Sequence, residues 1–458
     1  MRVAVLYDLG SAAPMEIVHG VGEAADPVFV IGDSAHARQM LPVLAEFCPV
    51  TLWEGPTRTA AALRATGPVH GMVTFSERML RPGSELAAEL GLPFHSVDTA
   101  VRLTDKDAQR RALLAAGVGS ARSRRISHAG QYAAAVAEVG VPAVVKPTVG
   151  EGSRDTYRID EVEHGRTLVT RLLPEAGSGV SYQLEELLVG RESGPFGDYV
   201  SVESLVVDKE PRHFAVSGKF PLVAPFRETG QFWPAPLPAA ERAEVEALVD
   251  AALAALGVTC GLTHTEVKLT PRGPRIIEVN GRVGGFINEL ARRLLGVDLM
   301  SVAAAASTGA GIAPLPAVQP GVHYQFSSLA PPYTQTVRGI EGVGAARKEP
   351  GVSSYRPLVH APARLSTGVA TQELDLLCGS APDHTDMFRT IHAVMSHLEF
   401  ALTTADGTEE TVPGTALPSA DSLEHWLSLS QGPSGLGDGL GRQAADRPHV
   451  RHDEQDNR

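Results

Sequence analysis

The sequence has few cysteines and no long apolar run, and both shortages limit what the protein can be. Its three cysteines, Cys48, Cys260 and Cys378, are too few and too scattered for a disulfide framework or a metal cluster, so we expect a reducing compartment. No stretch reaches the roughly 18 uninterrupted apolar residues of a spanning helix, and the opening apolar run is too short for a signal peptide. We therefore expect a cytoplasmic protein.

The sequence also lacks an excess of positive charge. Its 458 residues carry a formal net charge of -13, which argues against nonspecific binding to nucleic acid or to an anionic membrane. With 43% hydrophobic and 20% charged residues, the composition is that of a globular protein long enough for a few domains. We expect small-molecule chemistry with no nucleic-acid or membrane partner, and leave homodimer formation open.

Two common phosphate-binding motifs are missing as well. The turn after the first predicted strand, at residues 8–11, lacks the G-x-G-x-x-G spacing of a dinucleotide site. The glycine-rich stretch at 147–153 follows Lys146 and leads into a strand, whereas a Walker A loop places its lysine after the glycines and opens a helix. Such a loop can still fold over phosphates beside Lys146, although taken alone an ordinary hairpin turn is the commoner explanation.

The most informative stretch that is present is 262–285, which is typical of a β-hairpin. Two alternating runs, 264–270 and 275–280, flank a turn rich in proline and glycine. If the pairing is symmetric about Arg272, Glu266 lies opposite Glu278. The alternation then places His264, Glu266, Lys268, Glu278 and Asn280 on one face, and Val267, Leu269, Ile277 and Val279 on the apolar face.

Two opposed carboxylates in this hairpin predict a bound cation. Like charges about 5 Å apart are destabilising unless something neutralises them. Two carboxylates and the amide oxygen of Asn280 suit Mg²⁺ or Mn²⁺ rather than zinc, and Mg²⁺ commonly completes its shell with phosphate oxygens. Arg282 follows among glycines, where it can approach a phosphate. The alternative is an ordinary solvated strand face, and a one-residue bulge would spoil the register.

The rest of the chain reads as α/β. Residues 1–103 predict a parallel βαβ sheet with strands at 2–7, 27–31, 50–53, 71–75 and 93–96 and helices such as 34–48 and 58–66. A helix over 104–117, capped by Thr104, places Lys106 in its first turn, where a cation opposes the helix dipole. Lys106 therefore either points into solvent or meets an anion.

Further elements follow in order along the chain. We expect strands at 142–146, 156–159 and 198–207, with helices at 239–256 and 287–295 on either side of the hairpin. Residues 211–237 read as a proline-rich loop that is either a substrate lip or plain surface. A linker at 311–320 leads to short strands and a late helix at 385–398, and the tail 432–458 is predicted to be disordered because it lacks apolar residues.

Taken together and in order, Lys106, VVKPTVGEGS, EELLVG with DYVSVE, and HTEVKL with IIEVNGRVGG resemble the ATP-grasp superfamily of carboxylate-amine ligases over roughly 100–310. GLTHTEVKL, RETGQFWPAPLP and the extra C-terminal part look most like bacterial L-amino acid ligases, which make dipeptides or related amides. The resemblance implies an N-terminal βαβ domain at 1–103, an ATP-grasp domain at 104–310 with a lid at about 142–210, and a C-terminal α+β subdomain at 320–430.

The resemblance also implies roles for individual residues, with ATP and Mg²⁺ (or Mn²⁺) as cofactors and a carboxylic acid and an amine as substrates. The ATP contacts would be Lys106 and Lys146 on the phosphates, Gly150, Gly152 and Ser153 in the lid loop, and Glu185, Glu186 and Leu188 at the adenine. For the ribose, Asp198 fits the context and Glu192 the spacing. The metal ligands would be Glu266, Glu278 and Asn280, and the catalytic cations Arg282 and Lys268.

The reaction implied by the resemblance proceeds through an acyl phosphate, which an amine then attacks. Cations stabilise phosphoryl transfer by positioning and charge, and a closing lid excludes water. Phe286 falls where those ligases have a pocket-lining residue, so it would limit side-chain size unless it is an ordinary core residue. The alternatives are a carboxylase or purine-pathway ligase of the same superfamily, and a nonenzymatic ATP-binding regulatory module.

Overall fold

The computed structural model describes residues 1–119, 121–173, 179–311, 318–366, 369–421 and 423. The predicted tail at 432–458 and most of the predicted linker at 311–320 lie outside these residues. Within the described chain, the helices are too short or too polar to cross a membrane. The cytoplasmic location stays a prediction.

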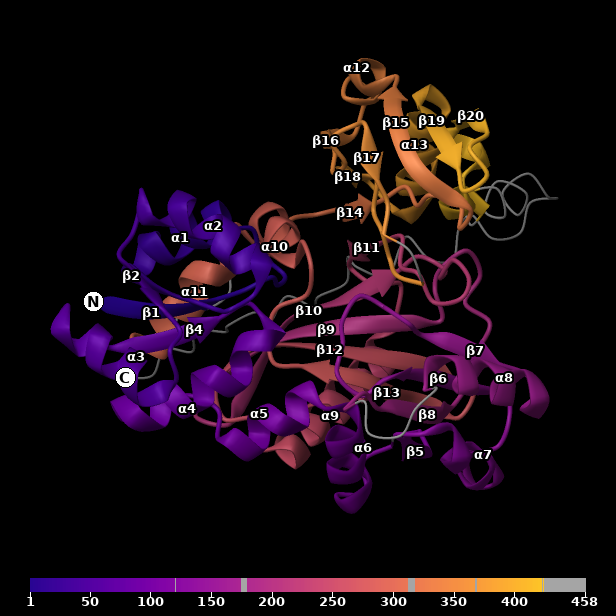
Figure 1. Ribbon diagram of the computed structural model, residues 1–458. Coiled ribbons are helices and arrows are strands. Elements are labelled where there is room, and N and C mark those ends of the chain that lie inside the picture. Colours follow the sequence, from indigo (N-terminus) through magenta and orange to yellow (C-terminus); the bar gives the residue numbers. More distant parts are fainter. Residues whose placement is uncertain (120, 174–178, 312–317, 367–368, 422, 424–458) are drawn as a thin grey trace, which may run out of the picture.

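The N-terminal part is a parallel sheet, as the sequence predicts, and it has four of the five predicted strands. Its strands are β1 (Arg2–Tyr7), β2 (Asp26–Ile31), β3 (Val50–Leu52) and β4 (Gly71–Thr74), in the order β3-β2-β1-β4. Helices α1 (Pro14–Ala24), α2 (Ala35–Ala45), α3 (Pro56–Ala65) and α4 (Leu80–Leu90) surround this sheet (Figure 1). Burial on both faces explains why β1 and β2 are rich in valine and isoleucine.

Two predictions for the end of this part are wrong. Residues 93–96 form no strand, because Ser96 caps helix α5 (Val97–Thr104) by accepting a hydrogen bond from the backbone N–H of Thr99. The helix predicted over 104–117 is α6 (Lys106–Ala115), and its cap is Asp105 rather than Thr104. Lys106 still lies in the first turn, as predicted.

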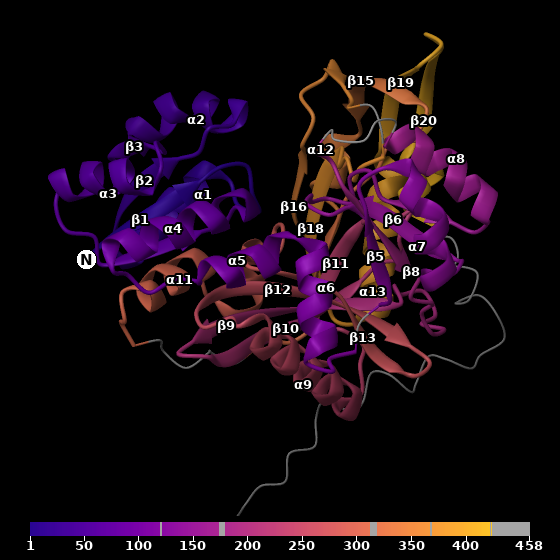
Figure 2. The ribbon, with the colours of Figure 1, turned by 60° about the horizontal axis from the view of Figure 1, so that its bottom comes forward.

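A small antiparallel sheet follows, with the strand order β5-β8-β6-β7. Its strands are β5 (Ser123–Ile126), β6 (Ala143–Pro147), β7 (Tyr157–Ile159) and β8 (Tyr182–Glu186), and helices α7 (Tyr132–Val139) and α8 (Val162–Leu172) lie beside it (Figure 2). Val145 and Leu184 pack into a core with these helices. Period-two alternation turns Lys146 and Glu185, the neighbours of those residues, toward the opposite face.

The largest sheet has eight strands in the order β13-β12-β9-β10-β11-β14-β18-β16. They are β9 (Tyr199–Val207), β10 (Glu210–Lys219), β11 (Gly230–Trp233), β12 (Gly261–Thr270), β13 (Gly273–Asn280), β14 (Val322–Phe326), β16 (Val352–Pro357) and β18 (Asp375–Ala381). Helix α9 (Ala239–Leu256) packs on the apolar face of the hairpin, and α10 (Ile287–Leu295) and α11 (Leu299–Ser307) follow it. The sheet thus joins strands from both halves of the chain.

The prediction of a proline-rich loop at 211–237 is therefore mostly wrong. All of 211–219 belongs to β10, and Trp233 is fully buried at the end of β11. The alternating pattern of β10 was hidden by its charged residues, and apart from Pro211 at the start of β10 the prolines lie in the connection between β10 and β11 and after β11. Residues 220–229 form a loop between β10 and β11, and this part of the prediction is confirmed.

The C-terminal part adds a second antiparallel sheet and a long helix. The sheet contains β15 (Thr334–Glu341), β17 (Ala363–Arg364), β19 (Glu399–Thr404) and β20 (Glu409–Pro413) in the order β17-β15-β19-β20. Helix α12 (Val343–Ala346) and helix α13 (His384–His397) pack with these strands around Phe388 and Phe400. The expected short strands and late helix are present, and the domain limits stay a prediction.

The hairpin β12–β13 has the predicted register at the base and a different one toward the turn. His264 pairs with Asn280 and Glu266 with Glu278, as predicted, but Val267 then pairs with Ile276. This one-residue bulge places Ile276 in the core and turns Ile277 toward the cavity, so the prediction of Ile277 on the apolar face is wrong. Because the bulge lies beyond the glutamate pair, the two carboxylates stay opposite each other.

Candidate active site

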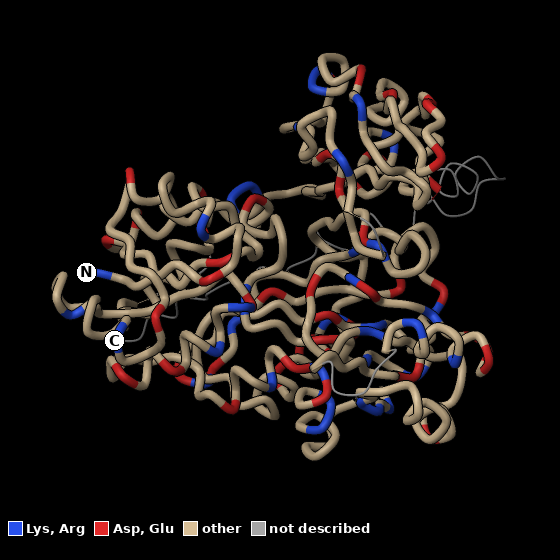
Figure 3. Tube along the Cα trace, in the orientation of Figure 1, with Lys and Arg blue, Asp and Glu red and all other residues tan. Residues whose placement is uncertain are grey.

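The predicted site residues gather around one cavity of about 870 Å³ between the small sheet and the large sheet. Figure 3 shows both signs of charge side by side along the strands of the large sheet. The predicted residues that line the cavity are Lys106, Lys146, Gly150, Gly152, Ser153, Glu185, Glu186, Leu188, Glu266, Lys268, Glu278, Asn280 and Arg282. Asp198 reaches the same wall through its ion pair with Lys268.

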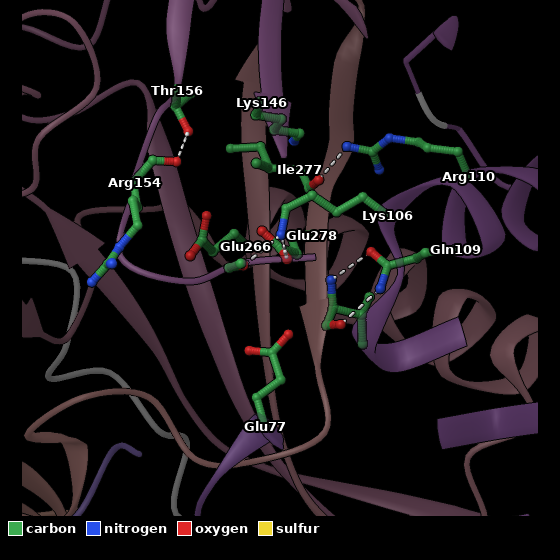
Figure 4. Close-up of polar contacts among 12 residues, drawn as sticks. Glu77, Lys106, Gln109, Arg110, Lys146, Arg154, Thr156, Glu266, Ile277 and Glu278 are labelled. Atoms are coloured by element: carbon green, nitrogen blue, oxygen red, sulfur yellow. Dashed lines mark hydrogen bonds and ion pairs between the residues drawn. The ribbon is translucent and has the colours of Figure 1, made fainter. Parts of the chain in front are cut away.

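Lys106 meets anions rather than solvent. Its Nζ lies 2.8 Å from Oε1 of Glu278 and donates a hydrogen bond to the carbonyl of Gly150 at 2.8 Å. Burial would lower the pKa of Lys106, but the charges of Glu278 and Glu77 outweigh it and the pKa is raised. Helix α6 thus carries a fixed cation to the hairpin and to the glycine-rich loop at once (Figure 4).

The other hairpin glutamate is held by a buried histidine. His264 lies 3.4 Å from Glu266 through Nε2 and 2.5 Å from Glu203 through Nδ1. Burial opposes the charge on His264, yet Glu203 and Glu266 raise its pKa to about 9. Burial also opposes the charge on Glu266, but His264 favours its ionised form and the pKa of Glu266 falls to about 2. Sequence reasoning missed Glu203, although DYVSVE contains it and alternation places it on the face of Ser201 and Tyr199.

Lys146 and Glu185 form an ion pair that also includes a residue missed by sequence reasoning. Lys146 lies 3.0 Å from Glu185, and Arg110 contacts the same carboxylate through Nε at 3.0 Å and Nη2 at 3.1 Å. Burial would raise the pKa of Glu185, but Arg110 and Lys146 lower it to about 2. Arg110 could have been found, because it lies four residues after Lys106 on the same face of α6.

The two candidates for the ribose lie in different surroundings. Asp198 accepts a hydrogen bond from Lys268 at 2.5 Å at the cavity wall, whereas Glu192 is exposed and does not line the cavity. The intervening residues bring Phe196 against Phe232 and Phe388. The segment between the two candidates therefore packs against the core of the C-terminal part before the chain reaches Asp198.

The glycine-rich loop is fastened to both neighbouring parts of the chain. The backbone N–H of Thr371 donates to the carbonyl of Gly152 at 3.2 Å, and that of Asp155 donates to Val369 at 2.8 Å. Arg78 lies 3.2 Å from Glu151. Gly152 adopts a left-handed conformation with φ 65°, which glycine allows at little cost. The loop thus forms a wall of the cavity between the N-terminal and C-terminal parts.

Arg282 also has a partner from the N-terminal part that sequence reasoning missed. Its Nη2 lies 3.6 Å from Oε2 of Glu77, a buried carboxylate. Burial raises the pKa of Glu77 to about 7 against the opposing effect of Arg282. Figure 4 shows Glu77 pointing toward Glu266 and Glu278. Glu77 follows β4 in a stretch that carried no recognisable pattern.

Phe286 lines the cavity and is not an ordinary core residue. It adopts a left-handed conformation with φ 58°, which is rare for an aromatic residue. Its carbonyl accepts a hydrogen bond from Nε2 of Gln325 at 2.9 Å, and the carbonyl of Gly285 accepts one from Gln231 at 2.8 Å. Two amide side chains from β11 and β14 therefore hold the segment after Arg282 in place.

The hairpin residues fit a hard divalent cation. Glu266, Glu278 and Asn280 offer oxygen atoms from two strands and line one cavity. No group of three or more His, Cys, Asp and Glu within the described residues is arranged to hold a metal ion, so a metal at the hairpin would need the amide of Asn280 beside the two carboxylates. Two carboxylates and an amide leave room for waters or phosphate oxygens, which is the coordination that Mg²⁺ favours.

The fold is the ATP-grasp fold, as the motifs predict. An L-amino acid ligase from Bacillus licheniformis superposes with a TM-score of 0.71 at 16% identity, over 87% of this chain and 98% of that one. The biotin carboxylase domain of the Hydrogenobacter thermophilus 2-oxoglutarate carboxylase superposes with a TM-score of 0.63 at 12% identity, over 92% and 93% of the two chains. That structure contains ADP with magnesium.

Sequence comparison matches a smaller part of the chain, to a more specific kind of enzyme. The alanine–anticapsin ligase of Bacillus subtilis is 28% identical over 247 residues, which cover 50% of this chain and 52% of that enzyme. The match therefore spans about half the length of this relative. No family model matches the chain. The resemblance to bacterial L-amino acid ligases, which the motifs predicted, is confirmed by these comparisons.

Proposed function

We propose that the protein is an ATP-dependent carboxylate-amine ligase that joins amino acids or related acids and amines, with ADP and phosphate as the other products. The observation that supports this most strongly is the arrangement of charge in one cavity. Three cations, Lys106, Lys146 and Arg282, lie around the opposed carboxylates of Glu266 and Glu278. A phosphate chain with a divalent cation is the ligand that such a mixture of charges fits.

The proposed nucleotide contacts are those expected from the motifs, with Arg110 added. Lys106 and Lys146 would bind phosphates, and the backbone of Gly150, Gly152 and Ser153 would cover them. Glu185, Glu186 and Leu188 line the cavity where the adenine is expected, and Arg110 holds Glu185 in place. Asp198 is the better ribose candidate, since Glu192 is exposed.

The proposed chemistry depends on metal ligands and two cations. Glu266, Glu278 and Asn280 would hold Mg²⁺, which supplies charge stabilisation for phosphoryl transfer when it is bound. Arg282 is held near the hairpin by Glu77, so it can stabilise charge on the transferred group. Lys268 contacts Asp198, and its predicted catalytic role would be exerted from that position. The loop at 150–153 would exclude water from the acyl phosphate.

Phe286 is the proposed size limit for a substrate side chain. Its ring lines the cavity, four residues after Arg282, and its backbone is fixed by Gln325. An aromatic ring occupies space that a larger substrate side chain would need. The acid and the amine that are joined are therefore expected to include at least one small side chain.

A phosphate-release screen over pairs of amino acids, with product masses read afterward, tests the proposal. We expect ADP, phosphate and a product equal in mass to the two substrates less one water. Glu266→Gln and Glu278→Gln should abolish phosphate release and weaken binding of ATP with Mg²⁺. The proposal fails if the protein releases no phosphate with any pair while these two variants bind ATP as the wild type does.

A further inference from the structure

The cavity has a second acidic region, away from the hairpin, which no predicted role explains. We call it the acidic corner, and it consists of Glu228, Glu373 and Tyr199, all of which line the cavity. Glu228 precedes β11 and Glu373 precedes β18. The backbone N–H of Glu228 donates to Oγ1 of Thr371 at 3.3 Å, which ties the two segments together.

The acidic corner lies beyond the hairpin along the large sheet. Cavity-lining residues advance strand by strand, from Glu266 on β12 to Tyr199 on β9 and Lys219 on β10. The strands β12 and β10 are two spacings apart, which is about 10 Å. Lys219 Nζ lies 3.5 Å from Oε2 of Glu228. Glu228 thus contacts the side chain of Lys219, a residue of the strand on the far side of β9 from the hairpin.

The negative charge of the acidic corner is only partly balanced. Lys219 pairs with Glu228, but the side chain of Glu373 has no hydrogen bond or ion pair within the described residues. Burial, followed by the charges of Glu228 and Asp375, raises the pKa of Glu373 to about 7. Asp375 is itself satisfied by the N–H of Ser328 and the hydroxyl of Tyr355. The corner therefore contains one more carboxyl group than cation, and a cationic ligand would favour the ionised form of Glu373.

A second observation in the corner is independent of its charge. The hydroxyl of Tyr199 lies beside Glu228 and, among the described residues, has no hydrogen-bond partner at bonding distance, although the residue is only 2% exposed. A buried hydroxyl without a partner is costly, and such groups commonly mark the place of a ligand. The unpaired carboxylate and the unpaired hydroxyl line the same cavity.

We infer that the acidic corner binds the positively charged side chain of an amino-acid substrate, an ammonium or a guanidinium group, through Glu373 and Glu228. This inference rests on the proposed ligase function. A cation with several N–H donors would pair with Glu373 and share Glu228 with Lys219. It could also donate a hydrogen bond to the hydroxyl of Tyr199. An acidic side chain would meet repulsion there.

Distance distinguishes a side-chain cation from the α-ammonium group. The reacting carboxylate must lie beside the hairpin, and its own α-ammonium is only two bonds from the carboxyl carbon. An α-ammonium in that position stays beside the hairpin, whereas a long side chain can extend past β9 toward Glu228 and Glu373. The attacking amine must be neutral when it reacts, so a group that stays bound as a cation in the corner cannot be the nucleophile. A long basic side chain satisfies both conditions.

The test compares matched substrates of equal shape and different charge. Lysine and norleucine differ in the terminal ammonium, and arginine and citrulline differ in the charge of the side-chain head. In the phosphate-release assay, each is supplied with a common partner amino acid, and kcat/KM is measured for the wild type. We expect the cationic member of each pair to be preferred about 10- to 100-fold, which is the range of charge-assisted hydrogen bonds.

Glu373→Gln removes the charge and keeps the shape, and it should abolish this preference while leaving kcat/KM for norleucine and citrulline unchanged. Glu373→Asp keeps the charge and should retain part of the preference. Glu399→Gln, at an exposed position of β19, is the matched control and should change nothing. Product masses show whether the basic amino acid enters as the acid or as the amine.

Three outcomes would overturn the inference without affecting the proposed function. The first is efficient ligation of neutral amino acids with no preference for their cationic counterparts. The second is a preference that Glu373→Gln leaves intact, since the cation would then bind elsewhere, and the third concerns a metal ion. Restoration of the Glu373→Gln defect by excess Mg²⁺ would mean that the corner binds a metal ion instead. Absence of ligation with every pair would contradict the proposed function itself.

Discussion

The two acidic regions of the cavity differ in whether their carboxyl groups have cationic partners within the protein. At the hairpin side, Glu278 pairs with Lys106, Glu185 with Lys146 and Arg110, and Asp198 with Lys268. At the acidic corner, Glu373 pairs with no cation in the described chain. The charges at the hairpin side are balanced within the protein, so ligand binding there exchanges one set of partners for another. Glu373 at the corner is neutral when it is protonated, and it gains a partner for its charge when a cationic ligand binds.

Among the ion pairs of the hairpin side, the loss of Arg110 should reduce stability most. Arg110→Ala removes the bidentate partner of Glu185 and leaves a buried carboxylate with Lys146 alone. We expect the free energy of unfolding to fall by about 3–5 kcal/mol. Urea denaturation measures this loss.

Arg111→Ala is the matched control for Arg110→Ala. Arg111 is the adjacent arginine, but its side chain is 72% exposed and pairs only with Asp107 within α6. Its removal should change the unfolding free energy by less than about 0.5 kcal/mol. Equal losses in the two variants would mean that the buried pair is no stronger than a surface pair.

A substitution at Lys106 tests whether the balanced charges are also catalytic. Lys106→Met removes the cation that joins Glu278 to the loop at Gly150. We expect kcat for phosphate release to fall about 10²- to 10³-fold, the usual effect of losing one preorganised donor to the transition state. Lys348→Met, at an exposed lysine after α12, should leave kcat unchanged. Retention of more than a tenth of the activity would contradict the role of Lys106.

The pH dependence of stability sharpens the same contrast. The folded pKa of Glu185, about 2, is below its ordinary value of 4.5, so its ion pairs contribute fully above pH 4.5 and are lost as the pH falls through about 2. The stability advantage of the wild type over Glu185→Gln should shrink by about 1.4 kcal/mol per pH unit within that window. Urea denaturation at a series of pH values measures this. An advantage that does not change across the window would show that the pKa is not lowered.

The smallest expected effect separates the two ribose candidates. Asp198→Asn should raise the KM for ATP about tenfold, because it removes a charged hydrogen-bond partner at the cavity wall. Glu192→Gln should leave this KM unchanged, since Glu192 is exposed. Steady-state kinetics with varied ATP measures both. The reverse result would move the ribose contact to Glu192.

Local pattern was enough to predict the hairpin and its neighbours. Alternation and turn residues predicted that Glu266 faces Glu278, and the 3.6-residue period predicted α9 and α10 at the residues where they begin and end. Lys106 was placed in the first turn of a helix although the cap was assigned one residue too early. These features depend on residues close together in the sequence.

The partners of the predicted residues could not be found in the same way. Glu77 reaches Arg282 across 205 positions, and Arg110 reaches Glu185 across 75. Such pairs depend on how sheets and helices pack, and a single sequence does not record that. Glu373 and Glu228 belong to this group as well, because the strands that follow them, β18 and β11, come together only in the order of the large sheet.

The bulge at Ile277 makes the two ends of the hairpin unequal in their tolerance to changes of length. An added residue in the turn at 271–274 would extend a loop and leave the pairing of Glu266 with Glu278 untouched. Deletion of Ile277 would instead draw Ile276 out of the core and toward the cavity. Homologous chains should therefore differ freely in length at the turn and keep the same count of residues between the bulge and Glu278.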